Sequence, residues 1–270
     1  MKRALFISQN LIGDGLNIYP ALKSWWNTHQ DWSIDLLTYP DHVSVIYEHM
    51  KIPLRVIYDA SAEGYDFSFS FDTNVAFRIG HENKVHIAKA YAIMLGVDIA
   101  PEDYRLVFDP PEEELTDREK GLVIVSPFSK SCSSNQGYPP NKMLPWGKWL
   151  PIIRFLRTLG PVGVIGSRTD RASGILEIPE DEYFTGLPLT RVAHILRRSK
   201  CVVTIDNGIA HMAASQLAKM VLFYPACLGT HWIIPLAPKD RLLQVIRMDP
   251  VSVDIVQLTL AVKHQLTTKL

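Results

Sequence analysis

The sequence predicts an α/β protein with two successive units, each built on a mostly parallel sheet with helices on its faces. Short β-branched apolar runs alternate with longer stretches of helical apolar spacing, which is typical of parallel sheets. This alternation stops at an acidic, proline-containing segment, Ile99–Lys120, and then restarts. A length of 270 residues with 47% hydrophobic residues provides ample material for a core.

The first half of the chain contains four predicted strands and three predicted helices. Apolar side chains recur at helical spacing from Leu16 to Trp26, so a helix is predicted over Leu16–His29 after a glycine-containing turn. A longer helix is predicted over Asn74–Leu95, with Gly96 placed to cap it. The remaining predictions are strands Ala4–Ser8, Ile34–Tyr39, Leu54–Tyr58 and Phe67–Phe71, and helix His42–Met50.

The segment Ile99–Lys120 predicts a boundary between domains. It carries three prolines and eight acidic residues, a composition typical of an interdomain connection. A solvated surface excursion within one domain is the alternative. We therefore predict a first domain over residues 1–110, a second over residues 120–252 and a terminal helical segment over residues 253–270.

The second half repeats the alternation. Pro145 stands near the start of a predicted helix that runs to about Leu159, because proline is tolerated in a first helical turn. Gly160 is placed to end this helix. A long polar loop, Lys130–Asn141, precedes it. The other predicted strands are Leu122–Ser126, Val162–Gly166, Cys201–Ile205, Met220–Tyr224 and Leu242–Arg247, and the other helices are Leu189–Ser199, Ile209–Leu217 and Val253–Leu266.

Composition and charge exclude several classes of protein. The 28 Lys and Arg balance the 28 Asp and Glu, so net charge gives no argument for non-specific nucleic-acid binding. No apolar run approaches the roughly 18–20 residues that a membrane span needs. The segment Met1–Ser8 predicts a first strand rather than a secretory signal, and hence a cytoplasmic protein.

Cysteines and histidines show no metal-binding pattern. The three cysteines are scattered without C-x-x-C spacing, and Cys201 is predicted to be a small buried hydrophobe. The nine histidines show no H-E-x-x-H spacing, so we predict no bound metal. The sequence has neither a G-x-S-x-G elbow nor a P-loop motif, which disfavours serine hydrolases and P-loop NTPases.

The turn after the first predicted strand carries Asp14 between Gly13 and Gly15. Two glycines let a backbone turn tightly and approach a ligand closely. Asp14 then has three interpretations: the N-cap of the following helix, part of a dinucleotide-binding loop, or a general base that projects into a cleft. The dinucleotide loop is disfavoured because Ile18 stands where G-x-G-x-x-G needs its third glycine.

A second turn, Asp206-Asn207-Gly208, leads from the strand Cys201–Ile205 into a helix rich in small residues. Free backbone N–H groups at a helix start, together with the positive end of the helix dipole, form a site for an anion such as phosphate. The alternative is an ordinary strand-to-helix turn that Asp206 caps, with a structural His211 one turn later.

Lys142 stands just before the helix predicted near Pro145. A lysine beside a helix N-terminus adds a second positive element to a phosphate site. An exposed loop lysine is the alternative.

These motifs, in this order, resemble the heptosyltransferase-type glycosyltransferases of family 9. Members typically begin with a strand, a G-D-x-L turn and a helix with P-A-L, here Gly13-Asp14-Gly15-Leu16 and Pro20-Ala21-Leu22. Their second domain has a K-x-W-P segment, here Lys142-Met143-Leu144-Pro145 with the tryptophan shifted to Trp146. It also has the motif D-[ST]-G-x-x-H-x-A-[AS], here Asp206–Ala214 with Asn207 at the Ser/Thr position. The resemblance covers roughly Ala4 to Pro235.

The resemblance implies a GT-B architecture, in which two Rossmann-like domains face each other across a cleft. The first domain would bind the acceptor and the second a nucleotide-sugar donor, and the terminal helix would return to the first domain. The implied activity is inverting transfer of a sugar from a nucleotide-diphosphate donor to an acceptor hydroxyl, in glycan or lipopolysaccharide-type synthesis. Because the backbone amides at the helix start, the helix dipole and Lys142 would supply positive charge at the diphosphate, we predict that transfer needs no divalent metal and no cofactor. Asp14 would be the catalytic base, in a loop formed by Gly13 and Gly15. The donor-binding residues that the motifs imply are Lys142, Asp206, Asn207, Gly208, Ile209 and His211. Ser129 and Lys130, after the predicted strand Leu122–Ser126, are further candidates for phosphate contact.

Other functions stay open on the sequence alone. A non-catalytic GT-B module that binds a nucleotide or a glycan would keep the Gly208 turn without needing Asp14. A nucleotide-sugar epimerase would turn over the donor without an acceptor, and a dinucleotide oxidoreductase would need the missing glycine. The sugar, the nucleotide and the acceptor also stay open, including a nucleic-acid acceptor and an acceptor reached by peripheral membrane association.

Overall fold

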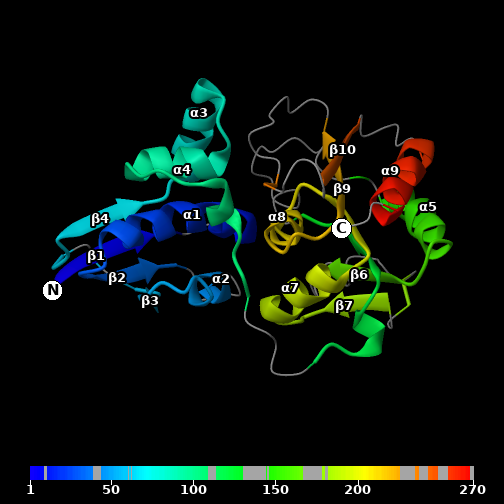
Figure 1. The fold of residues 1–270 in the computed structure, drawn as a ribbon, viewed down its shortest axis with the longest axis horizontal. Coiled ribbons are helices and arrows are strands. Elements are labelled where there is room, and N and C mark those ends of the chain that lie inside the picture. Colours follow the sequence, from blue (N-terminus) through cyan, green and yellow to red (C-terminus); the bar gives the residue numbers. More distant parts are fainter. Residues whose placement is uncertain are drawn as a thin grey trace. The chain divides into compact units, whose positions relative to one another are not determined.

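Two compact units make up the chain, each with its own parallel sheet (Figure 1). One contains Met1–Asp109, and the other contains Pro110–Gly229 and Pro235–Leu270. The computed structural model describes residues 1–8, 11–38, 44–59, 61, 63–108, 114–129, 144, 146–166, 178–179, 182–225, 235–236, 243–248 and 255–267.

The first unit is built on four parallel strands in the order β3-β2-β1-β4. Strand β1 lies between two neighbours, and Ala4, Leu5 and Phe6 are almost completely buried. The register pairs Leu5 with Asp35 on one side and Ser68 on the other. The strands confirm the four predicted apolar runs: β1 (Lys2–Ile7), β2 (Trp32–Leu37), β3 (Leu54–Ile57) and β4 (Phe67–Ser70).

The first helix begins earlier than predicted. Helix α1 (Ile12–Thr28) takes in Gly13 and Gly15, and neither glycine has a positive φ. The predicted glycine loop is therefore wrong, and with it a dinucleotide loop at this place. Gly15 instead permits a close helix contact, since a Cβ there would lie 3.3 Å from the hydroxyl of Tyr47 in α2 (Ser44–Glu48).

The single helix predicted over Asn74–Leu95 is two helices, α3 (Thr73–Asn83) and α4 (Ile87–Leu95). The break follows from local backbone conformation: Lys84 has a φ of 53°, and the Nδ1 atom of His86 accepts a hydrogen bond from the amide of Ala88 as the cap of α4. The five residues 80–84 between Ile79 and Val85 include no apolar side chain, so the apolar pattern is interrupted at the break. Gly96, with a φ of 72°, ends α4 as predicted.

Both ends of the acidic segment Ile99–Lys120 are ordered structure and not a free linker. The short 3₁₀ helix η1 (Pro101–Tyr104) lies against α1, where Lys23 and Asp103 form an ion pair of 3.1 Å. The side chains of Leu106 and Phe108 are buried. The second 3₁₀ helix, η2 (Asp117–Glu119), belongs to the second unit. Burial of Leu106 and Phe108 accounts for the packing of the first end, whereas the buried residue of η2 is the charged Glu119.

The second unit contains six parallel strands in the order β10-β9-β8-β5-β6-β7. The central strands read as continuous apolar runs because helices cover both faces of such a sheet. Strand β7 is an addition to the predicted set. The strands are β5 (Val123–Ser126), β6 (Val162–Gly166), β7 (Tyr183–Thr185), β8 (Cys201–Ile205), β9 (Met220–Pro225) and β10 (Leu243–Met248). As predicted, Cys201 is buried, and burial raises the pKa of its thiol to about 12.

The helices of the second unit are α5 (Trp146–Arg157), α7 (Leu189–Arg198), α8 (Gly208–Ser215) and α9 (Ile255–Thr267) (Figure 1). Leu258 and Val262 of α9 belong to the core of this unit, together with Trp149 of α5 and Val203 of β8. The resemblance implied that the terminal helix returns to the first domain, whereas these two side chains pack within the second unit. Among the described helices, none has the length and apolar character to cross a membrane.

Gly163→Ala is expected to lower the free energy of unfolding by about 1–3 kcal/mol, the usual cost of overpacking a core. A Cβ at Gly163 would lie 2.7 Å from Cε2 of Phe184 and 3.0 Å from Cδ1 of Leu122. Gly147→Ala in α5 is the control, because its Cβ would meet no atom within 4 Å. Urea unfolding of both variants measures the difference. A Gly163→Ala protein as stable as Gly147→Ala would contradict the packing argument.

Candidate functional site

In an open parallel sheet, ligands bind beyond the carboxyl ends of the strands. In the second unit, β5 and β8 are adjacent and parallel, with Ser126 paired to Thr204 at their ends. The segment after β5, which leads through Phe128 to Ser129, therefore lies beside the turn that follows β8 with Asp206 and Asn207. The structure brings together these two predicted parts of the donor site.

The N-terminus of α8 provides backbone amides at this edge of the sheet. Asn207 is the N-cap, and its Oδ1 atom accepts a hydrogen bond of 2.9 Å from the amide of Ala210. The amides of Gly208 and Ile209, in the first turn, have no acceptor within their own helix. Together with the helix dipole, they form a positive end suited to an anion. The predicted cap, Asp206, is wrong, because the side chain of the following residue takes this role.

The side chain of Asn207 also joins the two strand ends. Its Nδ2 atom donates to the carbonyl of Phe128 at 2.8 Å, to the hydroxyl of Ser126 at 3.1 Å and to the carbonyl of Ser126 at 3.2 Å. Asn207 is only 8% exposed. All of these partners are protein atoms, so its amide group is engaged within the protein.

Asp206 and His211 face each other beside this turn. Their Oδ1 and Nε2 atoms lie 3.7 Å apart, and the two side chains are 7% and 11% exposed. At this separation the two side chains form an ion pair whenever the imidazole of His211 is in its positively charged form. The small side chains of Ala210, Ala213 and Ala214 are buried, as predicted for a helix that lies close to its sheet.

Three predicted donor-site residues differ in what the structure says of them. Ser129 is described, is partly exposed and follows directly on the Phe128 carbonyl that Asn207 holds. Lys130 and Lys142 lie outside the described residues. The positive charge predicted from these lysines therefore stays a prediction, whereas the structure describes the backbone amides at the start of α8.

In the first unit, Asp14 lies in the first turn of α1, just beyond the carboxyl end of β1. The N-cap of this helix is Leu11, which makes no side-chain cap bond. The interpretation of Asp14 as the cap is therefore wrong. A carboxylate in a first turn is stabilised by the helix dipole, and Asp14 is partly exposed, as a base that reaches a substrate must be.

Hydroxyl groups accompany Asp14 at this edge of the first sheet. The hydroxyls of Tyr91 and Thr73 form a partly buried pair 2.9 Å apart, and those of Ser8 and Tyr47 form a second pair, which is buried. Burial first, and the negative charge of Asp14 second, raise the pKa of Tyr91. Sequence reasoning missed these side chains. Ser8 and Thr73 follow the ends of β1 and β4, so the strand-end rule could have found them, but no local pattern marks the two tyrosines.

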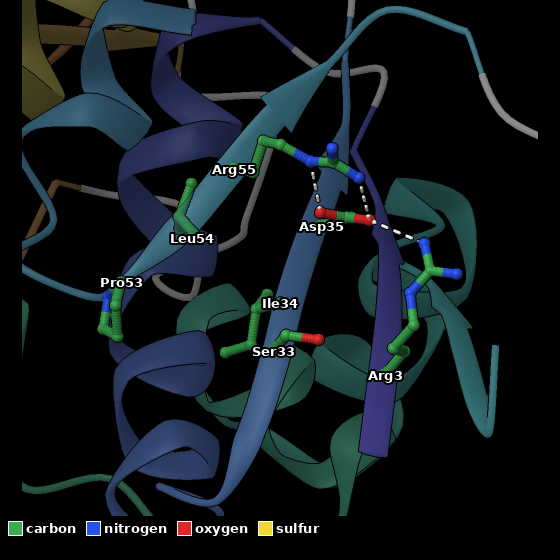
Figure 2. A pocket seen from close by; sticks show the side chains of 7 residues that line it. All are labelled: Arg3, Ser33, Ile34, Asp35, Pro53, Leu54 and Arg55. Atoms are coloured by element: carbon green, nitrogen blue, oxygen red, sulfur yellow. Dashed lines mark hydrogen bonds and ion pairs between the residues drawn. The ribbon is translucent and has the colours of Figure 1, made fainter. Parts of the chain in front are cut away.

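A separate charged cluster lies on one face of the first sheet (Figure 2). Two nitrogens of Arg55 each donate to the carboxylate of Asp35 at 2.8 Å, and Tyr65 and Arg3 donate to the same group at 2.6 and 3.4 Å. These bonds, led by those from Arg55, hold the pKa of Asp35 below its usual value. A shallow depression of about 390 Å³ lies here. Because the carboxylate of Asp35 in β2 accepts hydrogen bonds from Arg3 in β1 and Arg55 in β3, the cluster links these three strands.

Among the residues that the structure describes, no group of three or more His, Cys, Asp or Glu side chains could hold a metal ion.

Comparison with known proteins gives structural neighbours only. No protein-family model matches the sequence, and no curated protein sequence matches it. A family 9 glycosyl transferase from Veillonella parvula superimposes with a TM-score of 0.70 at 16% identity, covering 98% of this chain and 97% of that one. The E. coli ADP-heptose lipopolysaccharide heptosyltransferase II gives a TM-score of 0.65 at 14% identity, with 98% of both chains covered.

A third neighbour is the E. coli heptosyltransferase WaaC with ADP. Its TM-score is 0.65 at 14% identity, and the match covers 98% of this chain and all of that one. Similarity at these identities shows the fold. The chain therefore has the α/β fold of the GT-B type, with two parallel sheets, that these heptosyltransferase and family 9 glycosyltransferase structures share.

Proposed function

We propose that this protein is an inverting glycosyltransferase that moves a sugar from a nucleotide-diphosphate donor to an acceptor hydroxyl. The second unit binds the donor, and Asp14 in the first unit takes the acceptor proton. Solved structures of this fold include heptosyltransferases, one of them with ADP, which makes an ADP-sugar the first donor to test. A glycan or lipopolysaccharide-type acceptor is the matching first choice of acceptor.

The observation that carries the proposal is the junction between the segment that follows β5 and leads through Phe128 to Ser129 (the β5 segment) and the N-terminus of α8. As the sugar leaves, negative charge develops on the diphosphate. The amides of Gly208 and Ile209 are fixed donors at the positive end of a helix, and such preorganised groups stabilise developing charge without reorganising. Ser129, on the neighbouring strand end, would add a hydroxyl donor. Loss of one donor of this kind commonly costs about 10²–10³ in rate.

The acceptor hydroxyl must lose its proton as the new C–O bond forms. Direct displacement at the anomeric carbon inverts its configuration, so the enzyme needs one base and no covalent intermediate. Asp14 is a partly exposed carboxylate at the carboxyl end of a parallel sheet, and a general base of this kind contributes about 10²–10⁴ in rate. Asp206 and His211 would support the turn that holds the diphosphate.

Calorimetric titration of the whole protein with ADP, GDP and UDP tests the donor site. We expect at least one diphosphate to bind, and at 100 Kd it would raise the free energy of unfolding by about 2.7 kcal/mol. Incubation of the matching nucleotide sugars with and without candidate acceptors then tests transfer. Binding without turnover would indicate a non-catalytic module, and donor conversion without acceptor would indicate an epimerase. A protein that binds none of the three would refute the proposal.

We further propose that transfer needs no divalent metal, because the α8 amides supply the positive field at the diphosphate. Transfer is expected to continue unchanged in excess EDTA. Activity that vanishes with the chelator and returns with added Mg²⁺, Mn²⁺ or iron would overturn this part of the proposal alone. Diphosphate binding is measured separately, by calorimetric titration, and does not depend on the outcome of this assay.

A further inference from the structure

We propose that Asn207 is a positioning residue that sets the spacing between the β5 segment and the N-terminus of α8, and thereby the affinity for a nucleoside diphosphate. The inference rests on the proposed function, since it concerns the same donor site. It assigns Asn207 a role other than the direct donor contact that the sequence suggested. The diphosphate is held by the backbone around this side chain, and the side chain holds the backbone in place.

The bonding of Asn207 supports this role atom by atom. An asparagine side chain offers one acceptor oxygen and one NH₂ group with two hydrogens. Here the oxygen caps α8 through Ala210, while the nitrogen lies within hydrogen-bond distance of the two carbonyls of Ser126 and Phe128 and of the Ser126 hydroxyl. Both ends of the amide are therefore engaged, one toward the helix and the other toward the neighbouring strand end.

A second buried side chain strengthens the same connection. The hydroxyl of Thr204, which is completely buried, donates to the carbonyl of Ser126 at 2.9 Å and lies 3.4 Å from the Oδ1 atom of Asn207. The carbonyl of Ser126 thus receives hydrogen bonds from both residues. Satisfied polar networks in a low-dielectric interior are rigid, because each broken bond leaves a buried group without a partner.

The β5 segment is also fixed from its other side. The rings of Phe128 and Trp146 stack at a centroid distance of 6.0 Å and an interplanar angle of 20°. A Cβ at Gly166, the last residue of β6, would lie 3.0 Å from the Phe128 ring, so the glycine leaves room for that ring. With its ring and its carbonyl both held, Phe128 leaves little freedom to the next residue, Ser129. The position of Ser129 relative to the α8 amides therefore depends on Asn207.

A serine at position 207 separates the two functions of the side chain. Its hydroxyl oxygen can still cap a helix, because serine is among the best N-cap residues, but it is too short and has too few donors to hold both carbonyls. Asn207→Ser should therefore retain α8 and loosen the β5 segment. Asn207→Asp is the second variant, since it keeps the cap oxygen and the shape while removing the NH₂ donors. Asp72→Ser changes the cap of α3 in the other unit and serves as the control for a cap exchange.

The test combines two measurements on the full-length protein. Titration with ADP, GDP and UDP is expected to show roughly tenfold weaker binding to Asn207→Ser than to the wild type, the size expected for losing a net hydrogen bond or two. Hydrogen exchange is expected to accelerate in the peptide that spans Ser126–Ser129 and to change little in α8. Asp72→Ser should leave the diphosphate affinity unchanged. Thermal unfolding confirms that each variant is folded at the assay temperature.

The outcomes separate the inference from the proposed function. If the wild type binds a diphosphate and both Asn207 variants bind it equally well, the positioning role is wrong and the donor site stands. If exchange in Ser126–Ser129 is unchanged while affinity falls, Asn207 contacts the diphosphate directly and the inference is again overturned. A wild type that binds none of the three diphosphates removes the proposed function and the inference together.

Discussion

Asp14→Asn is expected to lower the rate of sugar transfer by about 10²–10⁴-fold, the contribution of a general base. The amide has the size of the carboxylate but cannot accept the acceptor's proton. Diphosphate binding should be unchanged, because the proposed donor site lies in the other unit. The folded protein should lose little stability, since one charge in a first helical turn is worth about 0.3–1 kcal/mol. Initial rates at saturating donor, with calorimetric titration of ADP, GDP and UDP, measure both quantities.

The matched comparison for this experiment is Asp72→Asn. Asp72 is a second carboxylate whose charge acts on Tyr91, but its Oδ1 atom accepts hydrogen bonds from the amides of Asn74 and Val75 as the cap of α3. Asparagine caps a helix as well as aspartate does, so this variant should keep most of the transfer activity. Full activity in Asp14→Asn, or an equal loss in both variants, would show that Asp14 is not the base.

Much of the fold could be predicted because its central strands are continuous apolar runs. The strand Cys201–Ile205 was predicted with the same bounds that the structure gives β8. The misplaced boundaries lie where a backbone conformation or a tertiary contact decides. The polar run of residues 80–84 interrupts the apolar pattern between α3 and α4, but it does not by itself show that Lys84 takes a left-handed conformation. Helix α1 begins at Ile12 and includes two glycines, against their own preference. At one of them, Gly15, the missing side chain leaves room for Tyr47, a tertiary contact that local sequence does not show.

The candidate site was predictable in its backbone and less so in its side chains. Strand-end position identified Asp14 and the turn Asp206–Ile209, because parallel strands gather their carboxyl ends at one edge. The roles of individual side chains depend on partners far along the chain. Asn207 bonds to Ser126 and Phe128, about 80 residues earlier, and no spacing rule connects them. The same limit hid Tyr91, which reaches Thr73 from a different helix.

The ion pair between Glu119 and Arg191 holds the end of the interdomain connection to the second unit. Two guanidinium nitrogens donate to the carboxylate at 2.7 and 2.8 Å, and the amide and hydroxyl of Thr116 each donate to it at 2.8 Å. The side chains of Glu119 and Arg191 are 7% and 17% exposed. The hydrogen bonds from Arg191 are the main reason why the pKa of Glu119 falls from 4.5 to about 2.

Glu119→Gln is expected to lower the free energy of unfolding of the second unit by about 3 kcal/mol at pH 7. This is the free-energy equivalent of the difference between the pKa of Glu119 in the folded chain and in the unfolded chain. Because the folded pKa is the lower one, this contribution is complete above pH 4.5 and is lost as the pH falls toward 2. The difference between wild type and variant should therefore shrink to about half near pH 3. Urea unfolding between pH 7 and pH 3, followed by tryptophan fluorescence, measures it.

Asp117→Asn is the control for this experiment, because it removes a carboxylate two residues away whose side chain is fully exposed and whose partner, Lys120, is itself on the surface at 3.3 Å. Exposed pairs of this kind contribute little to stability, so its unfolding curve should follow the wild type at every pH. If the Glu119→Gln difference were small at pH 7, or did not depend on pH below 4.5, the ion pair would not anchor η2.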